Sequence, residues 1–163
     1  MTQEFAYQCL DHSNRCQRSE KMEYPWMAIA RKYLGEHEIP GPKANAFIVK
    51  CLQSTTIGQP DNQSDETAWC SAFVNECLKE AGIKARTNSA WARSWLAWGR
   101  PPERDDEWEG CIVVLERGPN FGHAGFLNDW NGDMVQLLAG NQGDAVSLSW
   151  FPMERVLGFR VPV

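Results

Sequence analysis

Residues 67–82 have the sequence TAWCSAFVNECLKEAG, which is the most regular pattern in this chain of 163 residues. The apolar side chains fall at positions 69, 70, 73, 74, 77, 78 and 81, a spacing of three to four residues. That spacing predicts an amphipathic helix, which Asp65 or Thr67 can cap at its start and Gly82 can end. Cys70 then lies at or near the first turn of this helix.

Other helical patterns surround this segment, and strand-like runs follow it. Helices are predicted over Trp26–Leu34, Asn45–Thr55 and Asn88–Trp98. Five short apolar or alternating runs separated by turns then predict strands over Cys111–Leu115, Ala124–Leu127, Met134–Leu138, Val146–Trp150 and Val156–Val161. The helices thus come first in the chain, and a meander of about five antiparallel strands follows them. This segregation predicts an α+β fold.

Length and charge narrow the possible functions. Residues 1–23 are polar and weakly patterned, which predicts an N-terminal extension of unknown role, whereas residues 24–163 suit a single domain. The net charge of −5 argues against a nucleic-acid partner, which would need a basic surface. No apolar run is long enough for a stable membrane anchor. The first twenty residues lack the apolar core of a signal peptide, so we expect synthesis in the cytoplasm without one.

The six cysteines allow three explanations, namely disulfides, a metal site or one reactive thiol. They form no C-x-x-C pair and the three histidines are scattered, so we expect no metal and no other cofactor. Cys9 and Cys16, like Cys70 and Cys77, are seven residues apart, about 10 Å along one helix and too far for a disulfide. We therefore expect free, mostly buried thiols.

Cys70 departs from this expectation because of its position in the helix. The partial positive charge at a helix N-terminus lowers the pKa of a thiol, and the free N–H groups there can stabilise an oxyanion. Cys70 is thus a candidate nucleophile. The alternative is that Cys70 is only the first buried position of an amphipathic helix.

His123 is the candidate base for this nucleophile. It opens a predicted strand and has small neighbours on both sides, whereas His12 and His37 lie in polar or turn segments and are expected at the surface. A third polar group must orient the imidazole, and the next hairpin offers Asn141 as the first candidate and Gln142 as the second. The alternative for His123 is a half-exposed histidine on a strand without a catalytic role. The alternative for Asn141 and Gln142 is a simple turn.

Several segments of the chain resemble known motifs. Trp69–Val74 followed by Gly82-Ile83 resembles the cysteine-helix motif of the NlpC/P60 and CHAP superfamily of cell-wall hydrolases. Gly110–Val114 and Gly122–Phe126 resemble the two strands that follow it there, with Cys111 where Asp is common. The segments 38–42 and 140–143 resemble a subgroup of small bacterial and phage proteins. Together the resemblance covers about residues 24–163.

This resemblance implies a papain-like fold, with N-terminal helices packed on an antiparallel sheet. It implies Cys70 as nucleophile, His123 as base and Asn141 as the polar third member. The residues beside these three, Trp69, Ser71, Gly122 and Gln142, are predicted to line the cleft or bind substrate. The implied substrate is bacterial peptidoglycan, cut at peptide or amide bonds of the stem peptide or crossbridge.

We therefore expect a cysteine amidase or endopeptidase that acts in the periplasm or cell wall of a target cell. An antibacterial effector of the type VI secretion kind would have a cognate immunity protein and a component of the secretion apparatus as partners. A phage-type endolysin is the alternative with the same chemistry. A non-catalytic module that binds peptidoglycan or a protein, and an acyltransferase acting on lipids, are alternatives of other classes.

Overall fold

The structure is a computed structural model, and it describes residues 23–163. The predictions for residues 1–22, which include Cys9, Cys16 and His12, lie outside the described residues. In chain order the α-helices are α2 (Pro25–Lys32), α3 (Ala46–Gln53) and α4 (Cys70–Glu80). Short 3₁₀ turns follow or separate the longer elements: η2 (Asp61–Gln63), η3 (Ala92–Ala97), η4 (Asp105–Glu107) and η5 (Met153–Arg155).

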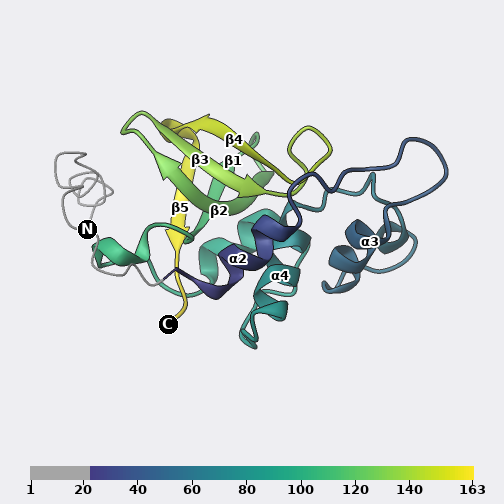
Figure 1. The fold of residues 1–163 in the computed structure, drawn as a ribbon, viewed down its shortest axis with the longest axis horizontal. Helices are drawn as coiled ribbons and strands as arrows, with labels where there is room; N and C mark the ends of the chain where they lie inside the picture. The colour runs from purple at the N-terminus through teal and green to yellow at the C-terminus, as the bar shows by residue number, and fades with distance from the viewer. Residues whose placement is uncertain (1–22) are drawn as a thin grey trace.

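The second half of the chain forms one antiparallel sheet of five strands. These are β1 (Ile112–Glu116), β2 (Gly122–Trp130), β3 (Met134–Ala139), β4 (Ser147–Pro152) and β5 (Val156–Arg160). Their order in the sheet is β4-β3-β2-β1-β5, so the chain runs as a meander from β1 to β4 and then returns to the other side of β1. Figure 1 shows this sheet above the helices. The predicted meander of about five strands is confirmed.

The helices cover one face of the sheet. Helix α4 packs against α2, α3 and β2, and Phe73 of α4 contacts Phe126 of β2 with ring centroids 6.3 Å apart. A second apolar cluster, which includes Val113, Leu127 and Leu137, fills the other side of the sheet. The cysteine-bearing helix therefore lies directly on the central strands, which is the predicted α+β arrangement of helices packed on an antiparallel sheet.

Helix α4 begins later than its capping residues suggested. Cys70 is its first residue and Trp69 its N-cap, with no side-chain capping hydrogen bond. The carboxylate of Asp65 accepts hydrogen bonds from the backbone N–H groups of Ile39 and Asn45 instead, at 2.9 and 2.7 Å. Asp65 therefore ties the loop before α3 to the loop before α4. The first N–H groups of α4 stay without a side-chain cap.

Candidate active site

Cys70 and His123 come from separate elements and meet at one end of the sheet. Cys70 is the first residue of α4, and His123 is the second residue of β2, opposite Leu115 of β1. A hydrogen bond joins their side chains, and backbone N–H groups of Ser71 and Ala124 also donate to the sulfur. Each of the two residues is only 4% exposed. The predicted pairing of cysteine and histidine thus exists in the structure.

The contact between the two side chains shifts both of their pKa values. Burial alone would raise the pKa of the Cys70 thiol, but the hydrogen bond and positive charge of His123 outweigh it and hold the pKa below the usual value. Burial would lower the pKa of His123, but the bond to Cys70 and the negative charge of its thiolate raise it above the usual value. Opposite shifts of this kind favour a thiolate–imidazolium pair.

Gln142, and not Asn141, is the residue that holds the imidazole. The Nε2 atom of His123 lies 3.0 Å from the side-chain oxygen of Gln142. Asn141 has a positive φ of 58° at the turn after β3, and its side chain makes no hydrogen bond to His123 within the described structure. The ranking of Asn141 above Gln142 is therefore wrong. The turn directs two successive side chains in different directions, and only the second one reaches the ring.

The surroundings of Gln142 fix which way its amide points. Its NH₂ group donates to the backbone oxygen of Ser147 at 2.8 Å and to that of Leu137 at 3.3 Å. The amide oxygen is thus left to accept from His123, so Nε2 carries the proton. Nδ1 is then the ring nitrogen available to Cys70. Gln142 therefore selects the tautomer in which Nδ1 can take the proton of the thiol.

The side chains next to Cys70 in the sequence serve the core instead of a cleft. Trp69 is fully buried, and its indole N–H donates to the Glu38 carboxylate at 2.8 Å. Ser71 is also fully buried, and its hydroxyl donates to the backbone oxygen of Ser89 at 2.7 Å. It also accepts from the indole of Trp95 at 2.9 Å. The prediction that Trp69 and Ser71 line the cleft is wrong, because both side chains lie inside the packed core.

Glycines on both sides of the site allow close packing. A Cβ atom on Gly140 would lie 2.3 Å from the ring of Trp69, so the turn that carries Gln142 can rest directly on the residue before Cys70. A Cβ atom on Gly122 would lie 3.1 Å from Arg93 and from the backbone oxygen of Leu115. Gly122 thus contributes by letting the chain approach next to His123, and no side chain is available there to bind substrate.

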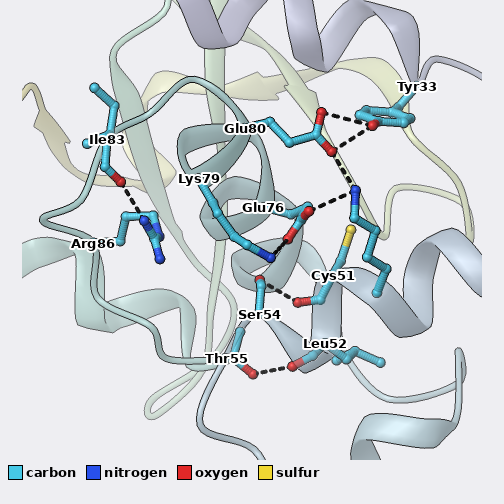
Figure 2. Close-up of polar contacts among 11 residues, drawn as sticks. Tyr33, Cys51, Leu52, Ser54, Thr55, Glu76, Lys79, Glu80, Ile83 and Arg86 are labelled. Carbon is cyan, nitrogen blue, oxygen red and sulfur yellow. Dashed lines mark hydrogen bonds and ion pairs between the residues drawn. The ribbon is translucent and has the colours of Figure 1, made fainter.

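The other cysteines of the described region have thiols whose pKa is raised and not lowered. Cys51, Cys77 and Cys111 are fully buried and free, and burial raises the pKa of each. Figure 2 shows Cys51 beside a cluster of charged side chains at the far end of α4, where Glu80 faces Tyr33 and Lys79 reaches Glu76. The charges of Glu80 and Glu76 also act on Cys77. Among the four described cysteines, only Cys70 therefore has a lowered pKa.

A cavity of about 260 Å³ lies beside the histidine. The eight residues around it are His123, Asn141, Gln142, Gly143, Ser149, Phe151, Arg117 and Arg155. The Phe151 ring lies 5.6 Å from the His123 ring, centroid to centroid. Sequence reasoning missed Phe151 and both arginines, because β4, the following turn η5 and the loop after β1 reach the site only through the sheet pairing. His37, by contrast, is exposed as predicted.

Neither a metal site nor a membrane span is found in residues 23–163. No group of three or more His, Cys, Asp or Glu side chains there could hold a metal ion. No helix in the same range is long and apolar enough to cross a membrane.

The fold is similar to that of a solved structure. No protein-family model matches the chain, and no curated protein matches it. The chain is similar to a crystal structure from Staphylococcus aureus described as similar to lipoprotein, NLP/P60 family, at 13% identity with a TM-score of 0.48. The match covers 98% of this chain and 48% of that one, so this chain spans about half the length of the structure it matches.

Proposed function

We propose that the protein is a cysteine hydrolase that cuts amide bonds in the peptide part of bacterial peptidoglycan. The observation that carries this proposal is the contact of Cys70 with His123, with the thiol pKa lowered and the imidazole pKa raised. A thiolate is the attacking form of cysteine, and burial alone would work against it. The choice of peptidoglycan rests on the motif resemblance around these two residues.

In the proposed first half of the reaction, the Cys70 thiolate attacks the carbonyl carbon of the amide. No side chain caps the start of α4, so the first-turn N–H groups other than that of Ser71, which donates to the sulfur, are available to the oxygen that becomes negative. The carbon–nitrogen bond then breaks, and the imidazolium of His123 gives its proton to the leaving amine. The acyl group remains on the sulfur as a thioester.

In the second half, water hydrolyses the thioester. Neutral His123 takes a proton from the attacking water, and the carbon–sulfur bond breaks to release the acid and restore the thiolate. Throughout, Gln142 accepts from Nε2 of His123 and keeps Nδ1 directed at the reacting atoms. Gln142 is therefore a positioning residue in this mechanism.

Mass spectrometry of digested peptidoglycan tests the proposal. Purified cell walls incubated with wild-type protein should release soluble muropeptides with one newly cut amide bond, and Cys70→Ala should release none. Release by Cys70→Ala at the wild-type rate would overturn the proposal. A wild-type protein that binds cell walls without cutting them would favour the binding-module alternative.

The biological setting is a separate proposal. We propose an antibacterial effector that reaches the periplasm or cell wall of a rival cell, with an immunity protein as its specific partner. A phage-type endolysin would use the same site. A neighbouring gene for a small exported protein that inhibits wall cleavage would support the effector, and a neighbouring gene for a membrane-hole protein would support the endolysin.

A further inference from the structure

The charged side chains that line the cavity beside His123 are all positive. Two of its eight lining residues are the arginines Arg117 and Arg155, and none is acidic. The chain as a whole is acidic, with a net charge of −5. Its composition therefore does not explain a cavity lined by two arginines and no acidic residue. Neither arginine forms a salt bridge within residues 23–163. The cavity is therefore a local site of positive charge.

The fold holds one of these arginines in a defined orientation. Arg155 donates from Nε and Nη2 to the backbone oxygen of Glu116, at 3.2 and 3.0 Å. Its guanidinium carbon also lies 5.3 Å from the centre of the Phe151 ring. These contacts position the planar fork and leave Nη1 without a partner in the described structure. Arg155 is thus preorganised to donate to a further acceptor.

The second arginine comes from the loop that leads to His123. Arg117 follows β1 directly, and its backbone N–H donates to the oxygen of Phe121 at 3.1 Å, which closes the loop before β2. The side chain is exposed, and its positive charge acts on His123. The two guanidinium groups therefore border a cavity that His123 and Gln142 also border.

We propose that this cavity binds a free carboxylate of the substrate, on the residue that contributes the leaving amine. This inference rests on the proposed function, because His123 must give its proton to that amine and so must face that half of the substrate. Arginine pairs with carboxylates through charge-assisted hydrogen bonds, often two at a time. A volume of about 260 Å³ suits one residue of a peptide and not a large ligand. The substrate class is thus an acidic peptide.

Binding to the inactive full-length chain tests this inference without turnover. Isothermal titration calorimetry with Cys70→Ala would compare the tripeptide L-alanyl-γ-D-glutamyl-meso-diaminopimelate with its form in which both diaminopimelate carboxyl groups are amidated. We expect the free carboxylate form to bind about tenfold more tightly. Adding Arg117→Gln and Arg155→Gln together should remove that preference. Arg155→Lys, which keeps the charge and loses the fork, should retain part of it.

Controls separate local effects from general ones. Lys84→Gln removes one positive charge from an exposed position outside the cavity and should leave the tenfold preference intact. Within residues 23–163 the Arg117 side chain makes no hydrogen bond, so Arg117→Gln alone stays informative if Arg155→Gln unfolds the protein. Equal affinity for the two peptides, binding of neither, or a preference that survives both substitutions would overturn the inference.

The hydrolysis assay tells this inference apart from the proposed function. Cutting of cell walls together with equal affinity for both peptides would overturn the carboxylate site and leave the hydrolase standing. An arginine-dependent preference without any cutting would support a carboxylate site and overturn the hydrolase.

Discussion

The two ends of helix α4 hold cysteines with opposite chemistry. Cys70 at the first position and Cys77 two turns later are both buried, yet the pKa of Cys70 is lowered whereas that of Cys77 is well above the usual value. Burial raises the pKa of a thiol at both positions. The difference comes from the neighbours, because Cys70 faces His123 and backbone N–H groups, and Cys77 faces Cys51 and the carboxylates of Glu80 and Glu76.

Position in a helix and degree of burial therefore do not by themselves make a cysteine reactive. The N-terminal end of α4 combines an uncapped first turn with a hydrogen-bonding histidine from the sheet. The C-terminal end combines the same helix with the hydroxyl of Tyr33, just after α2, and the charged Lys50 of α3, which stabilise packing. One end is thus suited to chemistry and the other to stability.

The largest expected effect is on activity. Cys70→Ala should reduce release of muropeptides by about 10⁴-fold or more, because the attacking atom is lost. Cys77→Ala should leave the rate within about twofold of wild type and cost about 1 kcal/mol of unfolding free energy through the small cavity it creates. Product release measured by chromatography, with urea unfolding as the control, checks both. Similar losses of activity in the two variants would contradict the assignment of Cys70 as the nucleophile.

The next effect is on thiol reactivity. At pH 6, iodoacetamide should alkylate Cys70 about a hundredfold faster than Cys77 in the folded protein. Since only the thiolate reacts, a lowered pKa moves the onset of alkylation to lower pH. His123→Ala should move this onset to higher pH, because burial then raises the pKa of the Cys70 thiol without an opposing positive charge. Peptide mapping after timed alkylation gives the rates, and an unchanged onset in His123→Ala would contradict the assigned role of His123.

A smaller effect distinguishes the two candidates for the third polar residue. Gln142→Ala should lower the rate of muropeptide release about tenfold, because His123 loses the acceptor that fixes its tautomer. Asn141→Ala should change it by less than twofold. The pH at which activity begins should also shift in Gln142→Ala, which a purely structural loss would not cause. A larger loss in Asn141→Ala would restore Asn141 as the orienting residue.

Much of the fold and half of the site could be predicted from local patterns. The three-to-four spacing around Cys70 and the alternating runs around His123 directly encode a helix and a strand. The choice between Asn141 and Gln142 depends on the path of the turn after β3, which no periodic pattern encodes. Trp69 and Ser71 were expected at the cleft because they adjoin Cys70 in the sequence. Successive helical residues point about 100° apart, so neighbours in sequence often face the core instead.

The smallest expected effect tests whether the two ends of α4 are independent. Lys50 Nζ lies 2.9 Å from Oε1 of Glu76, whose side chain is only 1% exposed, and 2.7 Å from Oε1 of Glu80. Within the described residues, Lys50→Met would leave the buried Glu76 with Lys79 as its only ion-pair partner, so we expect a loss of about 1–2 kcal/mol in unfolding free energy. Solvent screening of the half-exposed lysine favours the lower figure.

The readout of this last variant separates stability from chemistry. Urea unfolding should show the loss for Lys50→Met and almost none for Lys84→Met, which removes an exposed lysine elsewhere. The alkylation rate of Cys70 should be the same in both variants and in wild type, because the charges at the far end of α4 are two turns from the thiol. A slower rate in Lys50→Met alone would mean that the charged cluster also supports the thiolate, and the division of the helix into a chemical and a structural end would then fail.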